Sequence, residues 1–308
     1  MTFLNLIRYR NLLLLAFMQL IFRFGYLEIV KIPLSMWHWQ YFLLILCTTL
    51  IAAGGYVIND IFDQETDSIN KPEKVCIGTK ISEELAYKIY AGLTIAGVGI
   101  GFILSNSIQH PNFAGLYVLI AILLYLYSST LKKIAVFGNI VVALVLGFSV
   151  IIIGIFDIYP NTFPINQQLM SLHFSILFGY AKFAFIINFI REIVKDIEDI
   201  KGDKLDKLST LPIVIGTKNT TKIVSVLILI PILFLLYYCD IYLMSSKLIY
   251  TTLYILFLVV APLQYCAIKI WNATEKKDFQ HISTILKWIL FFGIISITVL
   301  TFNIKYNG

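Results

Sequence analysis

The stretch Asn59-Asp60-Ile61-Phe62-Asp63-Gln64-Glu65-Thr66-Asp67 ends a long apolar run of the chain. Its three aspartates stand at positions i, i+3 and i+7, a spacing that on an α-helix places their carboxylates within an arc of roughly 60°. The same spacing recurs in the second half of the chain, again just past an apolar segment. We name these residues the first aspartate triplet (Asp60, Asp63, Asp67) and the second aspartate triplet (Asp196, Asp199, Asp203).

Carboxylates at the ends of apolar segments need counter-charge, because like charges repel and a low dielectric penalises ions. Divalent cations meet both needs. A ligand set made only of oxygen atoms favours Mg²⁺, which keeps part of its water shell and shares the rest of its coordination with substrate phosphates. The two triplets therefore predict Mg²⁺ bound together with a diphosphate at a membrane surface.

The composition is typical of a membrane protein. Of the 308 residues, 59% are hydrophobic and 14% are charged, and the mean hydropathy is +0.84. Ordinary globular domains carry about 25% charged residues, and a membrane-spanning helix needs about 20 mostly apolar residues. We predict one all-α domain, residues 1–308, folded as a bundle of nine transmembrane helices near 12–30, 41–61, 84–104, 113–130, 137–157, 169–190, 222–240, 248–268 and 284–303.

Basic residues set the predicted orientation. If the N-terminus lies inside, the cytoplasmic loops and helix ends hold all but five of the 24 lysines and arginines, in agreement with the positive-inside rule. Both triplets then face the cytoplasm, and we expect the protein in the plasma membrane. The net charge of +6 is explained by this topology and by anionic lipid headgroups.

Several other classes are disfavoured. No basic patch interleaved with aromatic residues stands apart from a membrane segment, so we expect no nucleic-acid partner, and we predict no obligate protein partner. The four cysteines form no CxxC pair, which disfavours a disulfide framework or a zinc site. The first apolar segment lacks a small-residue cleavage site, so we expect a retained span and not a signal peptide.

Basic and polar side chains near the triplets are candidate contacts to phosphate. Lys71 and Lys74 follow the first triplet, with Pro72 ending any helix between them. A phosphate bridged by metal needs cations for its remaining oxygens, although basic loops and interfacial tyrosines also occur where they serve topology alone. The other candidates lie at the cytoplasmic ends of spans: Arg8, Asn11, Tyr127, Lys132, Lys133, Arg191 and Lys195.

Some charged residues near or within the spans carry separate expectations. Glu198 is expected to point away from the Asp196 face into solvent, whereas Glu192, one turn before Asp196, is a candidate acid behind the metal ligands. Lys182 either lines the interior or reaches outward. Arg23 and Glu28 stand five residues apart, do not share a face of an α-helix, and are not expected to pair.

A weak internal repeat relates the two halves. The triplets match at an offset of 136 residues, as do Lys71 and Lys207, and Ile77-Gly78-Thr79-Lys80 recurs as Ile215-Gly216-Thr217-Lys218 at an offset of 138. This predicts two related modules that meet at one site. Transporters also contain such repeats, so the repeat alone does not decide the function.

These residues resemble the signatures of the UbiA superfamily of intramembrane prenyltransferases. Asn59-Asp60-x-x-Asp63-x-x-x-Asp67 and Asp196-x-x-Asp199-x-x-x-Asp203 resemble its two aspartate-rich motifs, and Tyr127 with Lys132 resembles the signature after its fourth span. The resemblance covers the whole chain. Residues 191–203, Thr210-Leu211-Pro212 and Ile69-Asn70-Lys71-Pro72 look most like the digeranylgeranylglyceryl phosphate synthase branch. Where the family often has Arg-Pro this chain has Lys74-Val75, which keeps the charge but not the bidentate fork of arginine.

The resemblance implies Mg²⁺-dependent transfer of a prenyl group, expected to be geranylgeranyl, from its diphosphate to the hydroxyl of a prenylated glycerol phosphate. The product is an ether lipid. Each triplet would hold one Mg²⁺, and Asn59 would help to fix the diphosphate. Charge on the leaving group would be offset by Lys71, Lys132 and Lys195. The acceptor phosphate would lie near the basic helix ends, with Arg8 or Lys133 as its first expected contact.

Two alternatives remain open from the sequence. The same chemistry could act on an aromatic acceptor such as a quinone precursor, because the choice of acceptor depends on cavity walls that the sequence does not reveal. A transporter with an acidic ion site would also explain acidic clusters and a repeat. A transporter would place these acids near the membrane midplane, whereas here they stand at the ends of the apolar segments.

Overall fold

The computed structural model describes residues 2–307, apart from the side chains of Lys74 and Asn307. Within that range the chain is helical, with one isolated bridge between Ile77 and Ile81 as its only β pairing. Nine helical segments are long and apolar enough to cross a membrane, which confirms the predicted spans: Tyr9–Leu27, His38–Phe62, Glu83–Ser107, Pro111–Ser129, Phe137–Asn161, Gln167–Leu205, Thr217–Met244, Ile249–Trp271 and Lys276–Tyr306.

These spans are built from α-helices extended or joined by short π- and 3₁₀-helices, which are labelled η. In chain order the elements are α1 (Thr2–Leu6), α2 (Tyr9–Phe22), η1 (Arg23–Leu27), α3 (His38–Phe62), α4 (Gln64–Asn70), η2 (Pro72–Lys74), α5 (Glu83–Ser107), η3 (Pro111–Phe113), α6 (Ala114–Ser129), η4 (Leu131–Lys133), α7 (Phe137–Ile153), η5 (Gly154–Ile158), η6 (Tyr159–Asn161), α8 (Gln167–Leu205), α9 (Leu211–Ile215), α10 (Thr217–Tyr238), η7 (Cys239–Met244), α11 (Ile249–Ile255), η8 (Leu256–Val260), α12 (Ala261–Trp271) and α13 (Lys276–Asn307).

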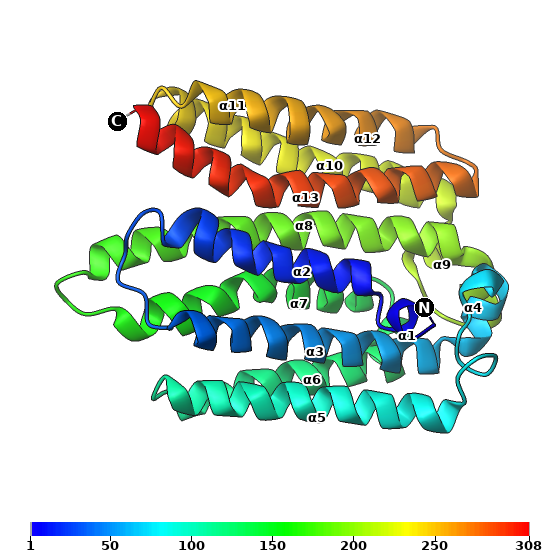
Figure 1. Ribbon diagram of the computed structural model, residues 1–308. Coiled ribbons are helices and arrows are strands. Elements are labelled where there is room, and N and C mark those ends of the chain that lie inside the picture. The colour runs from blue at the N-terminus through cyan, green and yellow to red at the C-terminus, as the bar shows by residue number, and fades with distance from the viewer. Residues whose placement is uncertain (1, 308) are drawn as a thin grey trace.

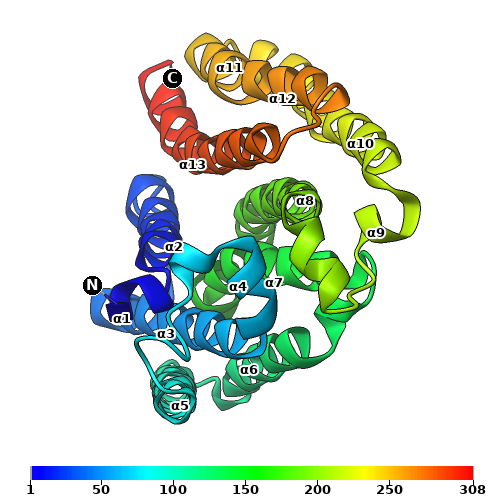
Figure 2. The ribbon, with the colours of Figure 1, turned by 90° about the vertical axis from the view of Figure 1, so that its right-hand side faces the viewer.

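The long helices run side by side, and the short helices α1, α4 and α9 all lie at the same end of the bundle (Figure 1). We call this the motif end, because the triplets lie there. Seen from the motif end, α10 to α13 form a group of their own (Figure 2). This group packs against the rest through α13, which contacts both α2 and α8, and through α10, which also contacts α8. In the rest of the bundle, α3 packs against α5 and α6, and α7 packs against α8.

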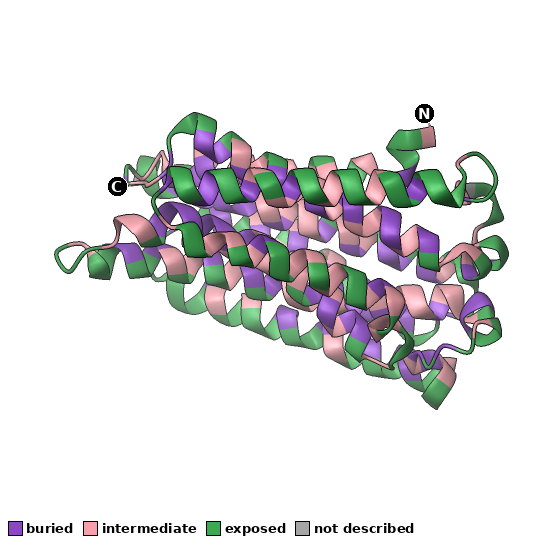
Figure 3. Ribbon diagram, turned by 90° about the horizontal axis from the view of Figure 1, so that it is seen from below, coloured by how far each residue is buried: buried purple, intermediate pink, exposed green. Residues whose placement is uncertain are grey.

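The burial pattern agrees with a lipid environment. Exposed residues recur along the outward sides of the helices (Figure 3), and many of them are large and apolar. Ile95 is 72% exposed, Phe257 70% and Leu233 65%. Such exposure would be costly in water, whereas in a bilayer it is favourable, and helices satisfy their backbone polar groups internally. The protein is therefore an integral membrane protein.

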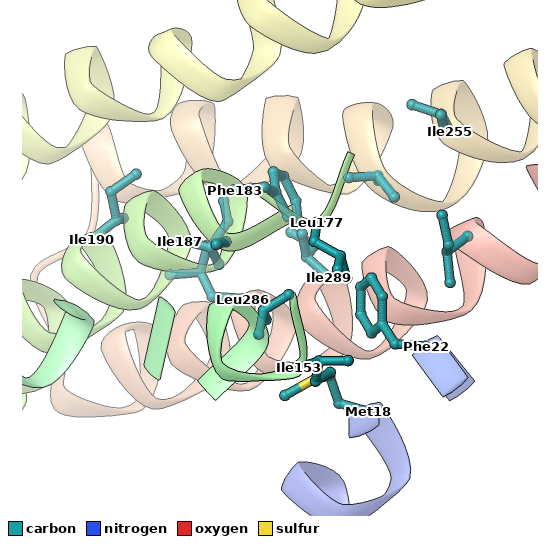
Figure 4. Close-up of a cluster of buried hydrophobic side chains, with 14 of the residues drawn as sticks. Met18, Phe22, Ile153, Leu177, Phe183, Ile187, Ile190, Ile255, Leu286 and Ile289 are labelled. Carbon is teal, nitrogen blue, oxygen red and sulfur yellow. The ribbon is translucent and has the colours of Figure 1, made fainter. Parts of the chain in front are cut away.

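One large apolar cluster runs through the interior of the group α10 to α13 and of the rest of the bundle. Figure 4 shows part of this cluster, including Phe22 from α2, Phe183 from α8 and Ile289 from α13. Because α13 supplies side chains to it, the last span joins the C-terminal group to the half of the molecule that holds the first triplet.

The two triplets differ in their backbone, and here one expectation was wrong. All of the second triplet lies on α8, which continues well past the predicted end of its span. The first triplet does not lie on one helix. α3 ends at Phe62, Asp63 adopts φ −99° and ψ 8°, and Asp67 belongs to α4. The break turns the chain so that α4 crosses the motif end toward α8 (Figure 2).

At the opposite end Arg23 and Glu28 form an ion pair, with Nε and Oε1 3.0 Å apart, so the expectation that they would not pair was wrong. The reason is local. Residues 23–27 form a π-helix, in which the Glu28 N–H donates to the Arg23 carbonyl at 3.0 Å. This i to i+5 repeat places residues five apart on one face. Arg23 also contacts the fully buried carboxylate of Asp157.

Candidate active site

Helix α4 is bound directly to α8, which brings the two triplets together. The Asn70 side-chain amide donates to the carbonyl of Asp199 at 2.8 Å and accepts from the Gly202 N–H at 2.9 Å. One turn earlier, the Thr66 hydroxyl donates to Asp206 at 2.9 Å. A Cβ at Gly202 would lie 2.4 Å from Asn70 Nδ2 and 2.8 Å from the Thr66 carbonyl. Only glycine allows so close an approach of the two segments.

Three cations reach into the carboxylates from three different segments. Arg8 lies 2.6 Å from Asp60. Lys132 of η4 contacts Asp63.

The third cation links the triplets themselves, because Lys71, just after the first triplet, contacts the second triplet at Asp199 with a separation of 2.5 Å. Carboxylates and cationic side chains therefore lie side by side in this site, as expected where both a metal ion and a phosphate bind.

Two amides complete this arrangement. Asn59 Nδ2 donates to Asp63 Oδ2 at 2.6 Å, and Asn139 Nδ2 donates to Asp196 Oδ2 at 2.8 Å. Asn139 was not predicted as a site residue. The glycine before it, Gly138, is the feature of the sequence that could have pointed to Asn139. A Cβ at Gly138 would lie 2.8 Å from the Lys132 Cα. Glycine thus lets the start of α7 approach the segment that carries Lys132.

The donor set fits a hard cation. The Oδ1 atoms of Asn59 and Asp199 are buried and accept no hydrogen bond, although buried acceptors are normally paired. Burial, together with the nearby Asp63 and Asp60 carboxylates, raises the pKa of Asp67 to about 6. Such an excess of oxygen acceptors over donors suits Mg²⁺. Among residues 2–307 no three acidic, histidine or cysteine side chains already form a metal-binding group.

The remaining acids lie around this centre. Asp203 is 5% exposed and lies within electrostatic reach of Asp199 and of Asp63 across the site. Glu192 binds Lys195 at 2.9 Å and Arg191 at 3.5 Å. These two cations are thus shared with an acid that is not in either triplet.

Other predicted residues have distinct positions. Tyr127 is half-buried, within electrostatic reach of Glu192, Asp63 and Asp196. Glu198 is half-buried, accepts from Gln280 of α13 at 3.2 Å and lies within electrostatic reach of Lys71, so it is less exposed to solvent than expected.

Three predicted phosphate contacts lie elsewhere or are not described. The Lys133 side chain is exposed, so it is not among the cations that contact the triplets. The Lys133 backbone carbonyl accepts from the Ser209 N–H at 3.1 Å. Asn11 accepts from Lys287 of α13 at 2.7 Å and lines a cavity with Tyr56, which stands one turn before Asp60, so it contacts neither triplet directly. The side chain of Lys74 lies outside the part of the chain that the structure describes.

Fold and site together define a polytopic membrane protein with paired aspartate segments at one end of a helical bundle. Residues 29–295 match the model of the UbiA prenyltransferase family, and the chain belongs to that family. This confirms the resemblance inferred from the motifs.

Within this family, the chain is similar to several proteins that carry the same name. A digeranylgeranylglyceryl phosphate synthase of Sulfolobus acidocaldarius is 35% identical over 188 residues, which cover 61% of this chain and 62% of that enzyme, so the match spans about three fifths of its length. A synthase of the same name from Methanobrevibacter smithii is 30% identical over 82% of this chain and 84% of its own.

Solved structures show the same fold. One described as a digeranylgeranylglyceryl phosphate synthase in membranes is 26% identical, with a TM-score of 0.64 and 97% of each chain covered. A UbiA homolog from Archaeoglobus fulgidus, bound to DMAPP and Mg²⁺, gives a TM-score of 0.57 over 96% of this chain and 99% of its own. At 16% identity this second likeness supports the fold alone.

Proposed function

We propose that the protein is a Mg²⁺-dependent membrane prenyltransferase that transfers a geranylgeranyl group from its diphosphate to the hydroxyl of a prenylated glycerol phosphate. The observation that carries this proposal is the joining of the two triplets by Lys71 and Asn70 at one end of the bundle. The naming of the similar synthases supports the choice of donor and acceptor.

In this proposal the residues of the chain act in defined ways. The two triplets and Asn59 would hold Mg²⁺, which would neutralise charge on the diphosphate and so make it a better leaving group. Arg8, Lys71 and Lys132 each exchange a carboxylate for a diphosphate oxygen as the substrate binds. Because these cations are already in place, they stabilise the charge that grows on the departing diphosphate with little reorganisation.

Departure of the diphosphate leaves an allylic cation in the apolar interior. The acceptor oxygen attacks its terminal carbon, the carbon–oxygen bond of the ether forms, and the hydroxyl proton is released to a nearby base. The long apolar cluster between α2, α8 and α13 excludes water, which would otherwise capture the cation.

The orientation belongs to the same proposal. The protein lies in the plasma membrane with its motif end toward the cytoplasm, and the basic residues gathered at this end support that orientation by the positive-inside rule. Charged diphosphate would then reach the site from the cytoplasm.

The test is product formation by the purified protein. Labelled geranylgeranyl diphosphate is offered with geranylgeranylglyceryl phosphate or with an aromatic quinone precursor, with Mg²⁺ and with chelator. We expect an ether product only with the glycerol phosphate and only with metal. Faster transfer to the phosphate-free aromatic compound would overturn the acceptor assignment, and transfer in chelator would overturn the metal assignment.

A further inference from the structure

A cavity of about 140 Å³ lies between α2, α3, α7, α8 and α13. Its lining is apolar in one part and polar and charged in another. Its deeper wall is apolar and includes Met18, Phe22 and Phe183, which Figure 4 shows in the interior. Its other wall includes Arg191 and Lys287. A ligand that matches both walls has an apolar chain and an anionic head.

The polar part of the cavity has an excess of positive charge. Lys287 lies within electrostatic reach of Arg191, Arg10 and Lys195. The acid that contacts this group is Glu192, which Arg191 and Lys195 already share. Lys287 itself makes its hydrogen bond to a neutral group, the Asn11 side-chain oxygen, at 2.7 Å.

Like charges held together at the end of an apolar cavity repel one another and are costly without an anion. The cations near the triplets differ, because Arg8, Lys71 and Lys132 each contact an aspartate. The two groups of cations are therefore suited to different ligands. The first serves a metal-bound diphosphate, and the second serves an anion that brings no metal.

We propose that Lys287 and Arg191, with Asn11 orienting Lys287, form a subsite for the phosphate monoester of the acceptor lipid, separate from the diphosphate site. This inference rests on the proposed function and assigns its acceptor specificity to residues of α8, α13 and α2. It differs from the prediction from sequence, which favoured Lys133 or Arg8, because Lys133 is exposed and Arg8 contacts Asp60.

The position of the subsite suits the reaction. Tyr56 lines the cavity and stands one turn before Asp60 on α3, and Arg8 lies 5.0 Å from the centre of its ring. The polar end of the cavity thus borders the first triplet. A phosphate held by Lys287 places the neighbouring glycerol hydroxyl beside the allylic carbon, while the acceptor's own chain fills the apolar part.

The central test compares Lys287→Gln with Lys277→Gln, an exposed lysine of the same helix. Loss of a charge-assisted hydrogen bond should raise the acceptor KM about tenfold to a hundredfold in Lys287→Gln. The KM for geranylgeranyl diphosphate should stay within about twofold. Lys287→Arg should restore much of the acceptor affinity, because it keeps the charge. An equal rise in both KM values, or an unchanged acceptor KM, would overturn the proposal.

A binding measurement separates this proposal from the enzyme assignment. Geranylgeranylglyceryl phosphate should raise the melting temperature of the purified wild-type protein more than geranylgeranylglycerol does, and Lys287→Gln should abolish that difference. This readout does not need turnover. Preferential binding of the phosphate compound without any transfer would contradict the proposed function but support the subsite. Transfer with no binding preference for the phosphate compound would contradict the subsite but support the proposed function.

Bulk membrane lipid is the other source of a phosphate head. The same measurements are made in nanodiscs of phosphatidylcholine alone and with anionic phosphatidylglycerol. The subsite proposal expects the Lys287→Gln effect in both. An effect that appears only with the anionic lipid would show that Lys287 binds bulk headgroups, and would overturn the assignment to the acceptor.

Discussion

Lys71 Nζ lies 2.5 Å from Asp199 Oδ2 and so links the loop after the first triplet to the second triplet, 128 residues away. Both side chains are about one fifth exposed. The contact shows that one site is made from both halves of the chain, and it places a cation between the two groups of carboxylates.

Lys71→Gln should lower kcat about a hundredfold or more, because it removes a cation already aimed at the leaving diphosphate. Transfer of labelled prenyl groups under saturating substrate measures this loss. The control is Lys80→Gln, an exposed lysine of the same loop, which should keep nearly full activity. A Lys71→Gln enzyme with half the wild-type rate would contradict the assigned role.

Asp63→Ala and Asp199→Ala should each abolish measurable transfer, since each removes a carboxylate from one of the proposed metal sites. Glu198→Ala should retain most activity, because the Glu198 carboxylate accepts a hydrogen bond from Gln280 of α13 and belongs to neither triplet. Transfer rates measured across a range of Mg²⁺ concentrations should show that physiological Mg²⁺ concentrations do not restore the activity of the aspartate variants. Equal damage from Glu198→Ala would show that the assigned face of α8 is wrong.

Gly202→Ala should lower activity about a hundredfold although every charged residue is retained. The new methyl group would collide with Asn70 and with the Thr66 backbone, pushing α4 from α8, and misplacement by about 1 Å can cost that much. Gly179→Ala on the same helix is the control, because a Cβ there meets nothing within 4 Å. If both variants behaved alike, the close approach of α4 and α8 would not matter for catalysis.

Arg23→Leu should lower stability by about 3–5 kcal/mol, because it leaves the fully buried Asp157 carboxylate without its cation. The thermal unfolding midpoint in detergent measures this. Adding Asp157→Leu should recover part of the loss, since a buried apolar pair avoids the cost of an unpaired charge. A double variant as unstable as Arg23→Leu alone would contradict this explanation.

The sequence by itself determined the fold class, the nine spans and the residues of both triplets. Apolar runs of sufficient length can satisfy their backbone in lipid only as helices, so composition and length are enough to predict them. The repeat also predicted the meeting of the halves. Gly78 and Gly216, equivalent in the repeat, both adopt positive φ, 78° and 84°.

The tertiary structure alone decided which side chains meet. The break at Asp63, the π-helix that pairs Arg23 with Glu28, and the amide of Asn139 on Asp196 depend on local backbone geometry and on helix packing. The sequence favoured Lys133 or Arg8 for the acceptor, whereas packing of α13 against α2 and α8 placed Lys287 beside Asn11 and Arg191. A residue's type and spacing determine its place on its own helix, but its partners are determined by how that helix packs against segments far away in the chain.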